Sequence, residues 1–321
     1  MAPIQNFTPK FLNMTLNLES LFEFMKSNPS EQECINYFEK LRWPNKVISP
    51  HDPTSKVYKC AGNKYKCKNT GRYFTVKTGT IFRNSNLSLQ KWFLALYILS
   101  NYKRGFSSCQ LAKEIKTTQP TAWFVLHRLR HIYDLPEFKT MLENSVEIDE
   151  TFVGGKNKNR HWNKKVPNSQ GRSWKDKVPV LGMKERNGNL ICKVVPNTQK
   201  GTLEPIIKKH IKEGSNVYTD EWLAYSDLGK WFNHQIVNHR IKQYVNGDAT
   251  TNRIENPWSH FKRMLYGTYY QAISPKHLQK YANEFTFRHN TRKYSEQEKF
   301  DLVLLASVGK SLSYRELIST F

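Results

Sequence analysis

The chain has 321 residues, of which 38% are hydrophobic and 13% aromatic, which is enough apolar material for two or three folded domains. This composition excludes an intrinsically disordered chain. Fifty Lys and Arg residues against 27 Asp and Glu give a formal charge of +23 and a pI near 9.7. Because such a surface attracts phosphate backbones, the charge favours a nucleic-acid partner over a protein whose charge only aids solubility.

Two features of the sequence predict a cytoplasmic protein. No stretch reaches the ~18 uncharged apolar residues of a membrane span, and the first residues lack a basic region followed by an apolar run. The five cysteines form an odd, scattered set, unlike the dense even frameworks of secreted domains. We therefore expect reduced thiols.

The N-terminal part begins with apolar residues at helical spacing over residues 18–42. The break at Asn28-Pro29-Ser30 predicts two short helices, with Ser30 and Glu33 forming a capping box for the second. Residues 43–80 consist of short aromatic and β-branched pieces between turn residues, which predicts a small β module.

Residues 87–133 return to helical spacing and end in the pieces SSCQLAKEI and PTAWFVLHRLRHIY, joined by a short polar break. Two such helices, with Pro120 in the first turn of the second, indicate a helix-turn-helix. The second helix carries His127, Arg128 and Arg130, and we expect the two arginines to face DNA phosphates. An ordinary helical hairpin with a solvated basic face is the alternative.

Beyond residue 145, strand-like runs alternate with a helical stretch and predict a mixed α and β fold. Asn187-Gly188 predicts a hairpin turn, and LEPIIKKHIKEG a helix. Residues 256–292 are helical again, with an interruption near Ser274-Pro275.

Three acidic residues stand where a predicted strand ends or a helix begins, namely Asp149 in VEIDET, Asp220 in VYTDEW and Glu255 in TNRIENPW. Strand alternation places Asp149 on the face opposite Val146 and Ile148, so its carboxylate lies in an apolar strand without joining the core. Carboxylates from distant segments bind pairs of Mg²⁺ ions about 4 Å apart, which catalyse phosphoryl transfer. The sequence therefore predicts a site for two divalent cations.

A structural alternative is open for each carboxylate, namely a helix cap or a surface salt bridge. It is strongest for Glu255, because Asn252 and Glu255 have the spacing of a capping pair and Pro257 indicates a helix start nearby. If the helix already includes Glu255, Lys262 lies nearly two turns on along the same face, with Arg263 beside it. These two cations are predicted to bind a DNA phosphate.

Several long segments, in order, resemble the transposases of the IS1595 insertion-sequence family over roughly residues 31–295. The segments that carry the resemblance are KYKCKNTGRYFTVKTGTIFRNSNLSLQKWFLALYILS, SSCQLAKEIKTTQPTAWFVLHRLR, VEIDETFVGGK, VYTDEWLAY, TNRIENPWSHFKR and PKHLQKYANEFTFRHNTRK.

The resemblance implies a DDE-type transposase with an RNase H-like catalytic core, whose triad falls on Asp149, Asp220 and Glu255. It implies cleavage and joining of double-stranded DNA at terminal inverted repeats with Mg²⁺ or Mn²⁺, by a homodimer or higher synaptic complex in the bacterial nucleoid. The expected fold is α+β, or mixed α/β. The expected parts are N-terminal helices (1–42), a degenerate zinc-ribbon-like module (43–80), a helix-turn-helix region (81–140), the RNase H-like catalytic domain (141–295) and a C-terminal tail (296–321).

The chain departs from the family pattern in the ribbon, where members often carry CPxC and a later CxxC. Here the first pair reads Ser49-Pro50-His51-Asp52, and the second reads Cys67-Lys68-Asn69-Thr70. Structural zinc needs about four nitrogen or sulfur ligands, so Cys60 and Cys67 are only weak candidates and we expect a metal-free ribbon. Family members also often carry His before the Thr-Asn pair, where this chain has Thr250.

Two other functions remain open from the sequence. A DNA-binding protein derived from such an enzyme would keep the fold without catalysis, as the lost cysteines suggest, although all three acids are present. An RNase H-like structure-specific nuclease would cut branched or hybrid substrates and leave no joined product.

Overall fold

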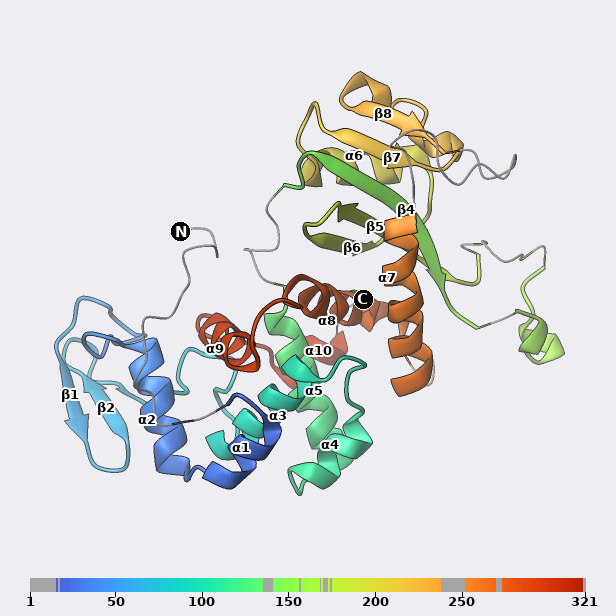
Figure 1. Cartoon of the computed structure of the whole chain (residues 1–321). Helices are drawn as coiled ribbons and strands as arrows, with labels where there is room; N and C mark the ends of the chain where they lie inside the picture. The colour runs from blue at the N-terminus through green and yellow to red at the C-terminus, as the bar shows by residue number, and fades with distance from the viewer. Residues whose placement is uncertain are drawn as a thin grey trace. The chain divides into compact units, whose positions relative to one another are not determined.

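The computed structural model divides into two compact units, one made of Met1–Tyr133 with Lys293–Phe321 and the other of Asp134–Arg292 (Figure 1). Among the helices it describes, none combines the length and the hydropathy that crossing a bilayer requires. The described residues are 16, 18–134, 141–155, 157–167, 169, 173, 175–237, 252–269 and 273–319.

The first unit is mainly helical. Its capping box is confirmed, because the Ser30 side chain accepts from the Glu33 backbone N–H and the Glu33 carboxylate accepts from the Ser30 backbone N–H. Pro120 lies in the first turn of the fifth helix, also as predicted. The elements are α1 (Leu21–Ser27), α2 (Glu31–Arg42), β1 (Val57–Cys60), β2 (Lys64–Cys67), β3 (Tyr73–Phe74), α3 (Leu89–Asn101), α4 (Ser108–Glu114), α5 (Gln119–Ile132), α9 (Glu296–Ala306) and α10 (Tyr314–Ser319).

The segment named above as a C-terminal tail contains α9 and α10, and it clusters with the first unit. Phe300 of α9 is fully buried and packs edge-on against Phe93 of α3, with 5.1 Å between the ring centroids. The hydroxyl of Tyr37 on α2 donates a hydrogen bond to the Asp301 carboxylate. Helix α9 therefore completes the core that α2 and α3 begin.

The ribbon is a three-stranded antiparallel sheet in the order β1-β2-β3. Cys60 pairs with Lys64 and Cys67 pairs with Val57, so the two cysteines lie at opposite ends of the β1–β2 ladder. That separation is about 10 Å along the strands, whereas zinc binds each sulfur at about 2.3 Å. Cys60 and Cys67 are therefore too far apart to bind the same zinc ion.

Hydrogen bonds join the two turns that would hold zinc in a complete ribbon. Ser49 Oγ accepts from the backbone N–H groups of His51 and Asp52, at 3.1 and 3.3 Å. Asn69 Nδ2, in the turn after Cys67, donates to Asp52 Oδ2 at 2.7 Å. The absence of zinc remains a prediction.

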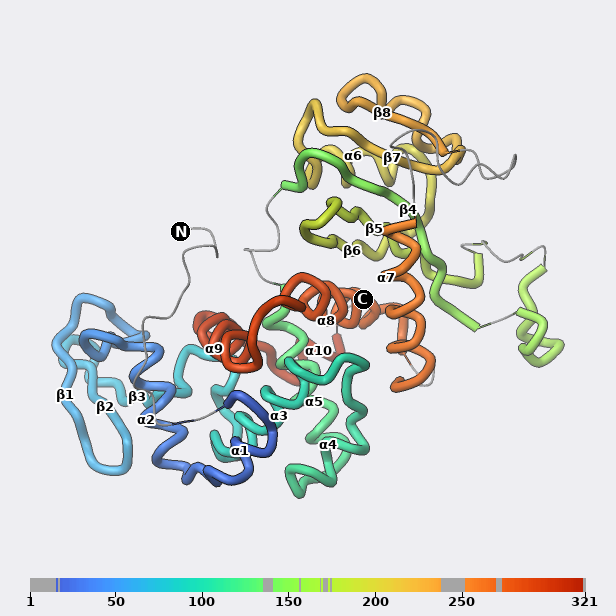
Figure 2. The backbone as a smooth tube through the Cα atoms, in the orientation of Figure 1, coloured from blue at the N-terminus to red at the C-terminus, as the bar shows by residue number. Residues whose placement is uncertain are grey.

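The second unit is built on a five-stranded sheet in the order β6-β5-β4-β7-β8 (Figure 2). Strand β4 is central, because β5 pairs with it antiparallel and β7 pairs with it parallel. The predicted hairpin is confirmed as β5–β6, with Asn187 at φ 62° in the turn. The main elements are β4 (Ser145–Val153), β5 (Val178–Glu185), β6 (Leu190–Val194), α6 (Lys200–His210), β7 (Asn216–Thr219), β8 (Asn233–Ile236), α7 (Asn252–Arg263) and α8 (Leu278–Asn290).

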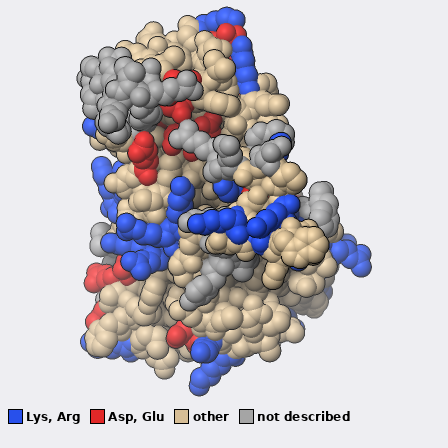
Figure 3. Space-filling model, turned by 90° about the vertical axis from the view of Figure 1, so that its right-hand side faces the viewer, with Lys and Arg blue, Asp and Glu red and all other residues tan. Residues whose placement is uncertain are grey.

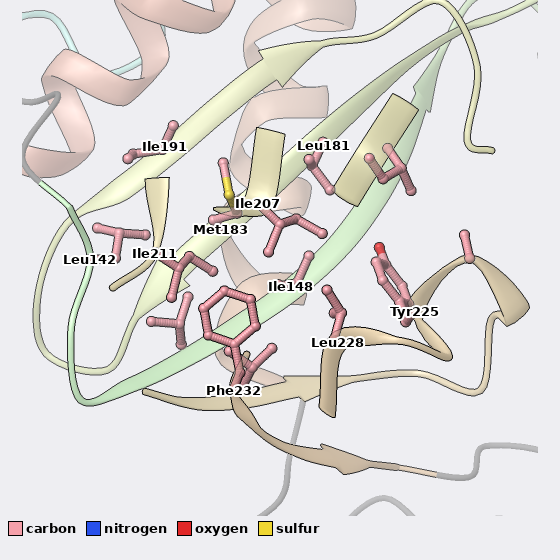
Figure 4. Close-up of a cluster of buried hydrophobic side chains, with 14 of the residues drawn as sticks. Leu142, Ile148, Leu181, Met183, Ile191, Ile207, Ile211, Tyr225, Leu228 and Phe232 are labelled. Carbon is pink, nitrogen blue, oxygen red and sulfur yellow. The ribbon is translucent and has the colours of Figure 1, made fainter. Parts of the chain in front are cut away.

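Helices cover both faces of this sheet, because successive side chains of its strands point to opposite faces and both faces carry apolar residues. On one face Ile148 and Met183 pack with Ile207 of α6 (Figure 4). On the other, Val180 packs with Phe261 of α7 among the buried residues that α7 and α8 contribute. The arrangement is a mixed α and β fold of three layers.

His289 on α8 predicts how the stability of this unit depends on pH. Burial lowers the pKa of His289 to about 3, and the nearby charges of Lys184 and Arg292 act in the same direction. The folded imidazole therefore stays neutral, while the unfolded one takes up a proton below about pH 6.5. Unfolding free energy should be constant above pH 7 and fall by about 2 kcal/mol between pH 7 and pH 5 from this group.

Urea unfolding of the wild type and His289→Gln at several pH values measures that contribution. We expect the variant to lose less stability on acidification, by about the same 2 kcal/mol. Parallel pH profiles for the two proteins would contradict the assignment of this pH dependence to His289.

Candidate active site

Two of the predicted acids lie on adjacent strands at the same end of the sheet. The parallel register pairs Glu147 of β4 with Tyr218 of β7. Extending this register by two residues places Asp149 beside Asp220, which directly follows β7. Adjacent strands are about 4.8 Å apart, so the two carboxylates converge as the sequence predicts.

Asp149 has an electrostatic environment that favours its neutral form in the absence of a cation. Burial, together with the charges of Asp220 and Glu255, raises the pKa of Asp149 to about 7, against hydrogen bonds from the Glu150 backbone N–H and the Trp258 indole. Both aspartates line one cavity of about 90 Å³, together with Glu150, Phe152, Thr198 and Trp222. The Asp149 carboxylate is therefore held in a small cavity beside other negative charge.

Helix α7 carries the third acid, whose charge acts on Asp149 but which does not line the cavity that Asp149 and Asp220 share. Glu255 is exposed in the first turn of α7, and Trp258 follows it three residues later on the same side of the helix. The Trp258 indole Nε1 donates to Asp149 Oδ2 at 3.0 Å. The hydrogen bond thus ties the helix that carries Glu255 to the strand that carries Asp149. Thr250, which stands where family members often carry His, lies outside the described residues.

Gly182 makes room for that contact. It pairs with Asp149 across the β4–β5 ladder, and a Cβ atom there would lie 2.4 Å from Trp258 Cζ2. Real Cβ atoms do not approach other carbons so closely. Only glycine lets the indole lie against β5 and reach Asp149.

Glu147 fixes the start of α7 through hydrogen bonds to its first turn. Its side chain is completely buried, and Oε2 accepts from the backbone N–H groups of Arg253 and Ile254 at 2.9 and 3.1 Å. These groups belong to the first helical turn, where N–H groups have no partner within the helix. Oε1 accepts from Arg186 at 3.1 Å, and the Arg186 guanidinium lies 4.2 Å from the Tyr218 ring centroid. Burial raises the pKa of Glu147, while Arg186 and the two amides oppose this rise.

The sequence analysis missed Glu147, Trp258 and Gly182 as determinants of the site. One signal was available, because strand alternation placed Glu147 on the same face as Asp149. A charged residue that shares the face of a catalytic carboxylate in an apolar strand needs a buried partner. The identity of that partner, a helix start more than a hundred residues later, was not readable from the pattern.

The three carboxylates do not form a complete metal cage. Within the residues that the structure describes, no three His, Cys, Asp or Glu side chains are grouped closely enough to hold an ion. In Figure 3 several acidic side chains lie close together in the upper part of the view, and others are scattered lower down among Lys and Arg side chains.

The predicted phosphate ligands fall into two classes. Lys262 and Arg263 are exposed on α7, the helix that carries Glu255, as their predicted role requires. Arg128 and Arg130 are 6% and 1% exposed in the core of the first unit. The placement of these two arginines on a DNA-facing surface is therefore corrected.

Arg128 has a structural reason to be buried. Its guanidinium donates to the backbone carbonyls of Leu312 and Arg83, both at 3.0 Å, and lies over the Phe124 ring. The exposed polar residues of the α4–α5 pair include Lys113 in the last turn of α4, Lys116 in the connecting turn and Gln119 at the start of α5. In helix-turn-helix proteins, the second helix contacts base edges with its N-terminal residues.

Comparisons with known proteins identify the family of this chain. Residues 141–290 match the family described as the ISXO2-like transposase domain. An uncharacterized protein in transposable element ISH50 of Halobacterium salinarum is 28% identical over 294 residues, which cover 87% of this chain and 98% of that protein. An uncharacterized transposase-like protein of Haemophilus influenzae is 35% identical over 105 residues, which cover 32% of this chain and 83% of that protein. The chain therefore belongs to the IS1595 family of ISXO2-like transposases.

Proposed function

We propose that this chain is an active DDE transposase, which binds the terminal inverted repeats of an insertion sequence and catalyses DNA cleavage and strand transfer. Its catalytic residues are Asp149, Asp220 and Glu255, carried by an RNase H-like core. The proposal of that core is supported by the sheet order, in which an antiparallel β6-β5-β4 meander continues into two parallel strands.

The observation that carries the proposal is the convergence of Asp149 and Asp220 in one cavity, with helix α7 tied to Asp149 through Trp258. A cap or a surface salt bridge does not account for Asp149. Its raised pKa instead indicates a buried carboxylate that gains when a cation neutralises the negative charge around it.

The donor set fits hard divalent cations, since all three side chains offer carboxylate oxygens. Asp149, Asp220 and Glu255 would hold Mg²⁺ or Mn²⁺. When bound, two such ions activate the attacking water or hydroxyl and stabilise the leaving oxygen. The protein's own part is positioning. Trp258 orients the Asp149 carboxylate, and the exposed cations Lys262 and Arg263 hold a DNA phosphate beside it.

The wider division of labour follows from the same proposal. The α4–α5 pair is a helix-turn-helix that reads the element ends, with Lys113, Lys116 and Gln119 toward DNA in place of the buried arginines. The degenerate ribbon, with its flanking helices, is expected to hold no metal. A homodimer or a higher synaptic complex brings two element ends together.

Substitution of the triad tests the proposal. Asp149→Asn, Asp220→Asn and Glu255→Gln should each lower Mg²⁺-dependent cleavage of DNA carrying the gene's flanking repeats on the order of a thousandfold. Glu213→Gln, an exposed acid after α6, is the control and should cut like the wild type. Product analysis on gels measures both cleavage and joining.

Each rival function has its own outcome in this assay. Binding without cleavage by the wild type would indicate a DNA-binding derivative. Cleavage of branched substrates without joined product would indicate a nuclease. Wild-type cleavage that survives all three substitutions would remove the assigned residues.

A further inference from the structure

The turn that follows β4 is a compact, strongly basic projection from the second unit. We name residues 157–167 the Trp162 loop. Four of its eleven residues are Lys or Arg and none is Asp or Glu, a density of positive charge about twice that of the whole chain. In Figure 1 the end of β4 and the turns after it project away from the five-stranded sheet.

This loop has a defined structure. The Asn157 side chain closes it, because Nδ2 donates to the Val166 carbonyl at 2.8 Å and Oδ1 accepts from the Val166 N–H at 3.0 Å. Arg160 donates to the Asp176 carbonyl at 2.9 Å, which anchors the loop to the segment that leads into β5. Its two short 3₁₀ turns are η3 (Asn157–Asn159) and η4 (Trp162–Lys164).

Trp162 lies on the outside of this closed loop. Its side chain is 87% exposed, whereas tryptophan is usually well buried in folded proteins. Lys158, Lys164 and Lys165 are exposed in the same loop, and among the described residues none of the three forms an ion pair. An exposed indole in a loop with exposed lysines suits a polyanion that also offers flat aromatic faces.

We infer that the Trp162 loop binds DNA, with the indole of Trp162 stacking on an unpaired base and Lys158 and Lys164 contacting phosphates. The bases inside a duplex are already stacked, so the indole takes a base at an end, a nick or a flipped nucleotide. This inference rests on the proposed function, since it takes DNA as the partner.

The loop is placed to act close to the cut. Asp149 and the loop belong to the same unit. Strand β4, which carries Asp149, ends at Val153, four residues or about 13 Å further on, and the loop follows it in the sequence. The loop begins at Asn157, eight residues beyond Asp149, so its start lies at most about 28 Å from that residue, a length that about eight nucleotides of duplex span. Nucleotides beside a cleavage site are those that become unpaired when a strand is broken and rejoined.

Binding measurements in EDTA test this inference without cleavage. The probes are a blunt duplex and the same duplex with a short single-stranded overhang that contains 2-aminopurine, whose fluorescence reports stacking. Trp162→Ala should weaken binding to the overhang duplex on the order of tenfold and abolish the 2-aminopurine signal, with little change for the blunt duplex. Trp162→Phe should retain most of both effects.

Matched variants separate stacking from charge and from nonspecific loss of surface. Lys164→Gln should weaken binding to both probes and lower the salt dependence by about one counterion. Phe22→Ala removes an aromatic ring that is 72% exposed in the other unit, and it should leave binding to both probes unchanged.

Equal binding of the two probes by Trp162→Ala and wild type would overturn the inference. So would a wild-type oligomer that dissociates in Trp162→Ala by light scattering while DNA binding persists, because Trp162 would then contact a second copy of the chain. Wild-type binding that depends on Trp162, without Mg²⁺-dependent cleavage, would instead overturn the proposed enzymatic function and leave this site intact.

Discussion

Gly182→Ala is expected to destabilise the protein by about 1–3 kcal/mol and to slow DNA cleavage up to about a hundredfold. The new methyl group would overlap Trp258 Cζ2 and Cη2, at 2.4 and 2.6 Å. The indole must then move away from Asp149, and α7 must move with it. Urea unfolding and Mg²⁺-dependent cleavage rates measure the two effects.

A second substitution separates packing from positioning. Phe is smaller than Trp and lacks the N–H group, so Gly182→Ala combined with Trp258→Phe should recover stability but not cleavage. The control is Gly201→Ala in α6, where a Cβ meets no atom within 4 Å. If Gly182→Ala matched the wild type in stability and cleavage, this account of the close contact would be wrong.

Glu147→Gln is expected to cost about 3–5 kcal/mol of stability and to lower the cleavage rate without weakening DNA binding. The substitution leaves Arg186 without its buried carboxylate and removes the charge that holds the first turn of α7. Glu255 would then lose its fixed position relative to Asp149. Urea unfolding, cleavage rates and DNA affinity are measured on the same preparation.

Glu143→Gln provides a matched control for Glu147. Its ion pair with Lys212 has the same 3.1 Å separation as the Glu147–Arg186 pair, but both of its side chains are more than half exposed. Exposed pairs contribute about 0–1 kcal/mol, so this variant should be close to the wild type. Similar losses of stability from the two variants would argue against the capping role of Glu147.

Local signals in the sequence predicted much of the secondary structure. The Ser30 capping box, Pro120 at a helix start and the Asn187-Gly188 hairpin each depend on residues within one turn of each other, and each is present. The convergence of Asp149 with Asp220 also follows from parallel pairing.

The rest depends on contacts between distant parts of the chain. Arg128 looked like an exposed cation on a basic helix, but its partners Arg83 and Leu312 are 45 and 184 positions away. The importance of Glu147 likewise depends on Arg253, 106 residues later. Periodicity within one element carries no information about such partners, so both assignments needed the folded chain.

The contact between α9 and α3 bears on how the protein is made. Phe300 and Asp301 complete a core whose other walls, including Tyr37 and Phe93, are translated more than 200 residues earlier. The second unit lies between these segments in the sequence, so all its strands and helices are synthesised before α9. During synthesis the first unit therefore cannot complete its core, and its aromatic surface stays exposed, until residues past 300 have left the ribosome. A message truncated near codon 292 would yield the carboxylate site attached to a helical unit that lacks one wall of its core.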